Sequence, residues 1–288
     1  MSLTTRIRAT AAEFNPALIR VRTDAWIRDR AERGRYRLVD EPALAATKKS
    51  ATLFVFGSGR SLAELPDASW RHFEAHDTLS FNWFPHQRRV RVDYHVIREV
   101  ASNDLDAAQW RPALEEYAGL IGGNPRYRDT VFVVQEGWRA VNGNRLIGLG
   151  LLPEGARVFR FRNRSRGVPE PPSWSFGQGL VHAVGTLNDC VNFGAILGWS
   201  HIVLVGVDLY DNRYFWLDEN ETRESLIAAG SGLSHRDPFP AAARYVTVFG
   251  LWRTALESRG IRLSVLNPKS VLAAVLPVYQ VPALGDAQ

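Results

Sequence analysis

The order of apolar and polar positions predicts a chain in which short strands alternate with helices. Apolar runs that end at glycine or at polar residues predict strands at 52–56, 78–81, 90–96, 130–135, 157–161, 202–207 and 262–266. Apolar positions with helical spacing predict helices at 105–119, 185–197 and 241–258. This alternation is typical of a parallel sheet with helices on both faces. We therefore expect an α/β fold built on a Rossmann-like, doubly wound parallel sheet.

Two regions depart from this alternation. Residues 1–50 contain a basic stretch at 16–35 whose apolar side chains share no single helix face, and we interpret them as a basic, helical N-terminal extension. Residues 51–288 then form the domain that carries the sheet. From about 211 to 240 the chain has few core residues, and a loop of that length in a compact domain is commonly a lid. We expect a lid in this segment.

Composition narrows the class of protein. Cys190 is the only cysteine, which excludes an internal disulfide and a thiolate metal site. Hydrophobic residues make up 45% of the chain and charged residues 23%, as in ordinary globular proteins. The apolar runs are far shorter than the roughly 18 residues of a membrane helix, and the first residues lack the apolar core of a secretory signal. We expect a cytoplasmic protein.

The positive charge of the chain is almost entirely arginine. Lysine and arginine together number 35, against 30 aspartates and glutamates, and lysine occurs only at positions 48, 49 and 269. Arginine suits the capture of phosphate and carboxylate groups. An anionic substrate, a nucleic acid and an anionic membrane surface are all compatible with this excess, as is a high genomic G+C content.

One segment that follows a predicted strand suits phosphate binding. In open parallel sheets, ligands bind at the carboxyl ends of the strands. Gly57-Ser58-Gly59-Arg60-Ser61 lies at such a place, where its glycines allow close backbone approach and the following helix offers N–H groups. It is not the six-residue dinucleotide fingerprint. An ordinary strand-to-helix turn is the alternative interpretation.

Two later segments also follow predicted strands. Asn82 could read a base or ribose edge, and a local backbone cap is the alternative. Asp208 follows a buried strand, with Tyr210 and Tyr214 just beyond it. A carboxylate in this place suits a ribose diol, and the two phenols can donate hydrogen bonds to phosphate oxygens. Packing of the tyrosines and capping by the aspartate are the alternatives.

The sequence argues against a metal site. Asp104 and Asp106 have the spacing of manganese-binding carboxylates, but they also suit the N-terminal cap of the helix that follows. His72 and His76 would share one helix face without a third ligand nearby. We expect no metal ion. The sequence also contains neither the nucleophile elbow of serine hydrolases nor a P-loop.

His235 is the histidine that we single out as a candidate general base. It lies in a glycine-rich stretch next to Arg236 and Asp237, within the expected lid. Neighbouring charges can tune the pKa of a histidine, and a closing loop can bring it to a substrate. An exposed loop histidine without a function is the alternative.

These segments, in this order, resemble the bacterial lipooligosaccharide sialyltransferases, glycosyltransferase family 42. The matching pieces are Phe54 to Leu62, Phe81 to Phe84, Ala195 to Trp199, Ile202 to Tyr210, Ser234-His235 and Leu266 to Leu272. The resemblance implies a single-domain, GT-A-like variant of the Rossmann fold with a lid. It also implies a metal-independent glycosyltransferase that transfers a nonulosonic acid, a sugar like sialic acid, from a CMP-activated donor to a glycan or lipid-linked oligosaccharide. No cofactor is implied beyond the CMP-sugar itself.

The resemblance also implies roles for individual residues. The nucleotide contacts fall on Gly57, Ser58, Gly59, Ser61, Asn82, Thr186, Gly206 and Asp208. The phenols of Tyr210 and Tyr214 would stabilise the departing phosphate in place of a metal. Phe239 occupies the position of the family's general base. Either a shifted loop lets His235 act as the base, or the base is absent. His95 and His182 are the substitutes that we consider.

Other departures keep further functions open. Trp83 and His182-Ala183 stand where the family has a polar amide and an arginine, so another CMP-linked sugar, such as 3-deoxy-octulosonate, is an alternative donor. A catalytically inactive nucleotide- or glycan-binding protein on the same fold is a second alternative. A nucleic-acid-binding protein is disfavoured because the basic residues are scattered, and we expect no nucleic-acid partner. Peripheral association with the inner face of the membrane and a homo-oligomer stay open.

Overall fold

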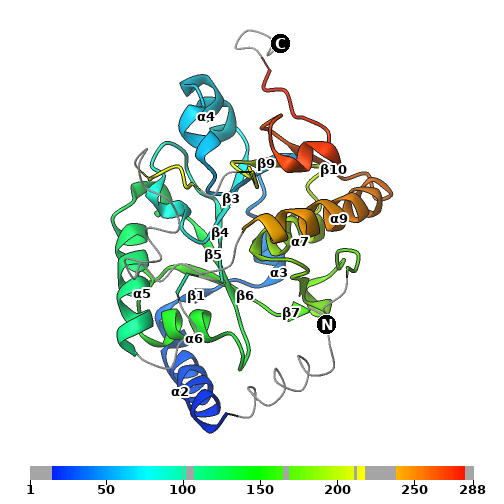
Figure 1. Cartoon of the computed structure of the whole chain (residues 1–288). Coiled ribbons are helices and arrows are strands. Elements are labelled where there is room, and N and C mark those ends of the chain that lie inside the picture. Colours follow the sequence, from blue (N-terminus) through cyan, green and yellow to red (C-terminus); the bar gives the residue numbers. More distant parts are fainter. Residues whose placement is uncertain are drawn as a thin grey trace.

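The computed structural model describes residues 15–98, 100–101, 107–164, 169–210, 213–217 and 238–282. Within these residues, eight strands form one sheet in the order β1-β6-β5-β4-β3-β2-β9-β10, and all neighbouring strands are parallel (Figure 1). The strands are β1 (Arg37–Leu38), β2 (Thr52–Phe56), β3 (Asp77–Phe81), β4 (Tyr94–Ile97), β5 (Val131–Gln135), β6 (Arg157–Phe161), β9 (His201–Val205) and β10 (Arg262–Val265). A separate parallel pair consists of β7 (Asn163–Arg164) and β8 (Leu180–Val181).

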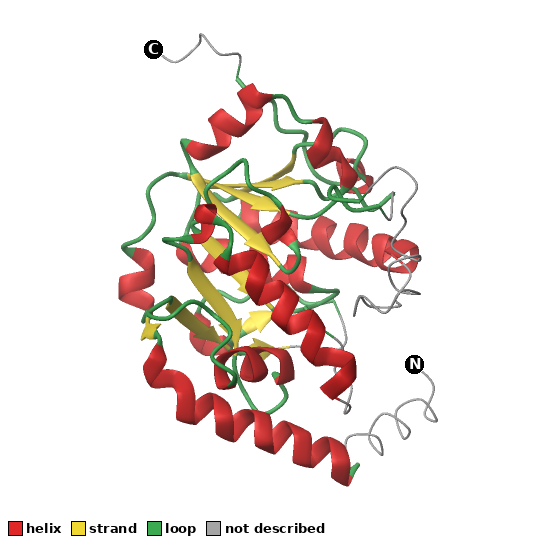
Figure 2. Cartoon of the chain, turned by 90° about the vertical axis from the view of Figure 1, so that its left-hand side faces the viewer, coloured by secondary structure: helices red, strands yellow, loops and turns green. Residues whose placement is uncertain are grey.

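Helices cover both faces of the sheet (Figure 2). The helices are α2 (Pro16–Glu32), α3 (Glu41–Ala45), α4 (Asp67–Glu74), α5 (Ala107–Gly122), α6 (Val141–Gly148), α7 (Thr186–Leu197) and α9 (Pro238–Glu257). Alternate residues of β2 face the two sides of the sheet: Phe54 and Phe56 pack among residues of α4, α5 and α6, whereas Leu53 and Val55 pack among residues of α3, α7 and α9. This arrangement confirms the predicted α/β fold with a doubly wound parallel sheet.

The chain reverses its direction across the sheet at β2. From β2 it moves through β3, β4 and β5 to β6, and then returns to the other side of β2 to form β9 and β10. β2 is therefore hydrogen-bonded to both β3 and β9. Open sheets of this kind bind ligands outside the carboxyl ends of the strands at such a switch point. The loops after β2 and β9 meet there.

The predicted elements agree with the structure in position and differ at some ends. The predicted strand at 90–96 begins only at Tyr94, because the chain turns between Gln87 and Asp93 before it joins the sheet. The predicted strand at 202–207 ends at Val205, because Gly206 adopts a φ of 65° that breaks the extended run. The prediction missed α6, because two glycines and two asparagines among its eight residues give it little helix propensity, although most of its residues are buried.

Residues before position 51 pack against the sheet. β1 pairs with β6, and α2 packs along α6. Asp29 of α2 is fully buried and pairs with Arg33 at 2.7 Å and with Arg160 of β6 at 2.9 Å. The predicted boundary at residue 50 therefore does not coincide with a gap in the packing. No helix in the described part of the chain is long and apolar enough to cross a membrane.

Candidate functional site

The loops after β2 and β9 interlock at the switch point. The N–H of Gly57 donates to the carbonyl of Val205, and the N–H of Gly59 donates to the carbonyl of Gly206, each at 2.8 Å. A Cβ added at Gly57 would lie 2.5 Å from the Gly206 carbonyl oxygen, and one added at Gly59 would lie 2.3 Å from Asp208 Oδ2. These two glycines are therefore required for contact between the loops. The contact between the loops therefore explains both glycines, whether or not a ligand also approaches the backbone closely here.

Asp208 holds the same two loops together. Its side chain is buried, and its carboxylate accepts hydrogen bonds from the Ser61 N–H at 2.9 Å, from Ser61 Oγ at 2.6 Å and from Asn267 Nδ2 at 2.8 Å. The structure thus brings Ser61 and Asp208 together. Because both carboxylate oxygens already accept bonds within the protein, this geometry favours the capping interpretation of Asp208 over an open ribose ligand.

The two predicted phenols lie at this loop pair. Tyr210 is exposed, and its hydroxyl accepts a hydrogen bond from Asn267 Nδ2 at 3.1 Å. Tyr214 forms an antiparallel bridge with Gly59, and its ring stacks on Trp216 with centroids 4.5 Å apart. The next residue, Phe215, donates its N–H to the carbonyl of Ser58 at 3.1 Å. Both tyrosines therefore reach the same edge of the sheet as the glycine-rich turn.

Asn82 and Thr186 meet at the neighbouring strand. Asn82 follows β3 with a φ of 47°, its N–H donates to the Val96 carbonyl of β4 at 3.1 Å, and its Nδ2 donates to Thr186 Oγ1 at 3.5 Å. Thr186 is the first residue of α7, after the N-cap Gly185. The N-terminus of a helix offers N–H groups and a partial positive charge to an anion. We call the group of Gly57–Ser61, Asn82, Thr186, Gly206–Tyr210 and Tyr214 the switch-point site.

Asn267 is a member of this site whose contacts the sequence did not reveal. It follows β10 and bonds to both Asp208 and Tyr210, so it links the carboxylate to the exposed phenol. From the sequence, the segment from Leu266 to Leu272 stands out only as part of the family resemblance. The signal that could have identified Asn267 was its place, because polar residues directly after a buried parallel strand lie at the ligand-binding edge.

The histidines that could replace His235 are already engaged. His95 is fully buried between Ser80 Oγ, 2.7 Å from Nδ1, and the Tyr117 hydroxyl, and burial lowers the pKa of His95 to about 3. His182 Nδ1 lies 2.9 Å from Asp189 Oδ2, and the Arg98 guanidinium also contacts the ring. Both imidazole rings are therefore held by hydrogen bonds within the protein.

Several candidates lie outside the described residues. They are His235, Asp104 and Asp106. Most of the predicted lid, residues 218–237, and the side chain of Phe239 also lie outside the described part of the chain. Among the residues that the structure describes, no group of three or more His, Cys, Asp or Glu side chains could hold a metal ion.

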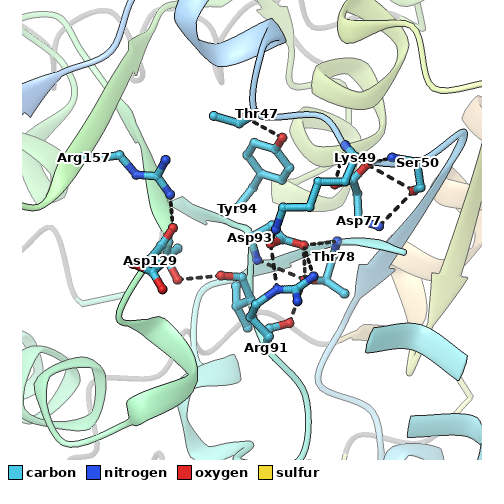
Figure 3. Close-up of polar contacts among 12 residues, drawn as sticks. Thr47, Lys49, Ser50, Asp77, Thr78, Arg91, Asp93, Tyr94, Asp129 and Arg157 are labelled. Carbon is cyan, nitrogen blue, oxygen red and sulfur yellow. Dashed lines mark hydrogen bonds and ion pairs between the residues drawn. The ribbon is translucent and has the colours of Figure 1, made fainter. Parts of the chain in front are cut away.

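A second polar cluster lies at the amino ends of the strands (Figure 3). Asp77 is fully buried and accepts hydrogen bonds from Ser50 N at 2.8 Å, from Lys49 N at 3.0 Å and from Trp199 Nε1 at 2.9 Å. Asp93 accepts from Lys49 Nζ at 2.6 Å and from Arg91 Nε at 2.9 Å. Because these carboxylates are saturated by partners within the protein, this cluster serves stability.

Comparisons with known proteins give few matches. No protein-family model and no curated protein sequence matches the chain. Among solved structures, the chain is similar to the monofunctional alpha-2,3-sialyltransferase Cst-I from Campylobacter jejuni, with 13% sequence identity and a TM-score of 0.40 over 84% of this chain and 82% of that chain. The fold described above rests on the sheet order and the packing, independently of this similarity.

Proposed function

We propose that the chain is a metal-independent glycosyltransferase that uses a CMP-activated sugar, a nonulosonic acid, as its donor. The observation that supports this proposal is the convergence of the switch-point site. Residues predicted separately, from the segments after β2, β3 and β9 and from the start of α7, come together at one edge of the sheet. The acceptor that we propose is a glycan or a lipid-linked oligosaccharide, and the place of action is the cytoplasm.

The proposed roles follow from the positions of these groups. The N-terminus of α7 provides N–H groups and a partial positive charge for the phosphate of the nucleotide, and the glycine-rich turn lies at the same edge of the sheet. Asn82 provides an amide for the nucleoside. Tyr210 and Tyr214 provide phenols for the charge that develops on the phosphate as it leaves. Asp208 and Asn267 act as positioning residues, because they fix the loops and the Tyr210 hydroxyl.

The proposed reaction exchanges one bond at the anomeric carbon. An acceptor hydroxyl forms a new bond to this carbon while the bond to the phosphate oxygen breaks, and CMP leaves with the electron pair. The proton of the hydroxyl passes to a general base, for which His235 stays the prediction. An inactive nucleotide- or glycan-binding protein is the alternative, and it would bind the same nucleotide without this step.

Calorimetric titration with CMP, CDP, UDP and GDP tests the proposal. We expect CMP to bind best, and binding to persist in excess EDTA because no metal takes part. Release of CMP from a CMP-sugar in the presence of glycans then separates an enzyme from a binding protein. Equal binding of all four nucleotides, or none, would contradict the proposed donor. A Gly59→Val variant would not test nucleotide binding at the glycine-rich turn, because the new side chain would collide with Asp208 and disturb the loops themselves.

A further inference from the structure

Four stacked aromatic rings join the chain beyond β9 to the segment that follows β3. The Trp216 ring lies nearly parallel to the Tyr214 ring, with centroids 4.5 Å apart and an angle of 3° between the planes. It also lies nearly parallel to the His86 ring, with centroids 4.5 Å apart and an angle of 8°. The His86 ring in turn stacks on Trp83, with centroids 6.0 Å apart. We call Tyr214, Trp216, His86 and Trp83 the aromatic stack.

The backbone around Tyr214 is bonded to the glycine-rich turn. Tyr214 forms an antiparallel bridge with Gly59, and the N–H of the next residue donates to the carbonyl of Ser58 at 3.1 Å. Arg60 Nη1 donates to the carbonyl of Leu217 at 2.8 Å. The turn after β2 therefore holds the backbone of Tyr214, and the aromatic stack holds its ring.

His86 contributes to the stack as an uncharged ring. It is half-buried, and burial lowers the pKa of His86 to about 4. The imidazole therefore carries no charge at pH 7. A group with such a pKa is poorly matched to proton transfer at neutral pH, for which the ideal pKa lies near the working pH. The structure thus favours packing, and not acid–base chemistry, as the role of His86.

A phenol that stabilises developing charge has to be in place before the reaction. Preorganised donors need no rearrangement at the moment when the charge develops. A misplacement of about 1 Å can lower a rate about 100-fold. Because the Tyr214 ring lies against Trp216, it cannot rotate away without losing this stacking contact. Tyr210 is held differently, through the hydrogen bond between its hydroxyl and Asn267.

We propose that Trp216 and His86 are positioning residues that fix the phenol of Tyr214 for the departing phosphate. The proposal rests on the proposed function, because it requires that Tyr214 acts on this phosphate. It assigns a role in the reaction to two side chains that lie outside the switch-point site. His86 belongs to the segment after β3 that also carries Asn82, so this segment would serve both the nucleoside and the leaving group.

A double-mutant cycle with Tyr214 tests the proposal. Trp216→Ala should lower turnover about tenfold, because the phenol is no longer held in place. CMP affinity should stay nearly unchanged, because the phenol acts on charge that develops only as the bond breaks. In the Tyr214→Phe background, which lacks the hydroxyl, Trp216→Ala should cause no further loss. Trp216→Phe and His86→Phe should keep most of the turnover, because each retains a ring that can stack.

Trp110→Ala is the matched control, because Trp110 is also half-buried but belongs to α5, where its ring lies 3.8 Å from the Arg145 guanidinium. It should keep the parent's turnover and CMP affinity. Trp216→Leu, which keeps an apolar side chain without a ring, repeats the test if the alanine variant does not fold.

Two results would overturn the role of the aromatic stack alone. They are parent turnover in Trp216→Ala, and a loss in that variant that adds in full to the loss in Tyr214→Phe. A parent protein that binds CMP but releases none from a CMP-sugar would instead overturn the proposed transferase, and the role of the stack with it.

Discussion

The two edges of the sheet carry similar polar residues and use them differently. At the amino edge, Asp93 accepts hydrogen bonds from cationic side chains of this chain (Figure 3). Asp77 accepts hydrogen bonds from backbone N–H groups and from an indole. At the carboxyl edge, Asn82 adopts a left-handed backbone conformation and Tyr210 is exposed. At the amino edge the two buried carboxylates are bonded within the chain, whereas at the carboxyl edge the Tyr210 hydroxyl belongs to an exposed side chain.

The direction of the helices explains part of this difference. A helix that follows a parallel strand begins near the carboxyl end of the sheet, so its free N–H groups point to that edge. Thr186 at the start of α7 is an example, and it lies beside Asn82. The comparison teaches that polarity alone does not mark a binding site. What distinguishes the carboxyl edge is polarity combined with helix N-termini.

The largest effect that we expect is a loss of stability at the amino edge. Asp77→Ala leaves the N–H groups of Lys49 and Ser50 and the indole of Trp199 without their buried acceptor. We expect the free energy of unfolding to fall by about 3–5 kcal/mol in urea titrations. The matched control is Asp129→Ala, an exposed aspartate at the same edge, which should change the free energy by about 0.5 kcal/mol or less. Equal effects of the two variants would contradict the comparison.

The next effect concerns catalysis at the carboxyl edge. We expect His235→Ala to lower turnover at least ~100-fold, because a positioned base typically contributes about 100- to 10,000-fold. CMP affinity should stay nearly unchanged, because the residue acts on the acceptor. Steady-state kinetics and calorimetry measure the two quantities separately. His182→Ala is the comparison variant. A larger loss of turnover in that variant than in His235→Ala would identify His182, and not His235, as the general base.

Much of the fold could be predicted from the sequence because buried parallel strands are short apolar runs with sharp ends. Thr52–Phe56 and Arg157–Phe161 were predicted with their observed bounds. The position of α2 could not be predicted, because its contact with the sheet depends on a buried ion pair between Asp29 and Arg160, which are distant in sequence. The same holds for β1, which has only two residues and joins the sheet through β6.

The candidate site could be predicted only as separate segments. Gly57, Asn82 and Asp208 each follow a predicted strand, and the rule that ligands bind at carboxyl ends suggested that they meet. The sequence could not show that Asp208 bonds to Ser61 and Asn267, because a carboxylate that caps a loop and one that binds ribose look the same in a sequence.

A smaller effect is expected at Asn82, where two substitutions distinguish a role in nucleotide binding from a role in the backbone turn. Asn82→Gly removes the amide and tolerates the φ of 47°, whereas Asn82→Ala removes the amide and adds strain. We expect both variants to lose CMP affinity about tenfold, the worth of one hydrogen bond of about 1.4 kcal/mol. Only the alanine variant should also lower the unfolding temperature. Unchanged CMP affinity in the glycine variant would show that Asn82 serves the turn alone.

The smallest effect is the pH dependence of the amino edge. Burial alone would raise the pKa of Asp93, but hydrogen bonds from Arg91 and Lys49 hold that pKa below its usual value of 3.8. A carboxyl whose pKa is lower in the folded state stabilises the fold above its usual pKa, and this contribution is lost as the pH falls through the folded value. We expect Asp93→Asn to cost about 1 kcal/mol at pH 7, since Lys49 and Arg91 are partly exposed. In urea titrations, the difference between the variant and the parent should begin to shrink as the pH falls below about 4, and it should vanish below the lowered pKa of Asp93, where protonation of Asp93 removes the same charge. A difference that stays constant down to pH 2 would show that the ion pairs contribute nothing and that the substitution acts through packing alone.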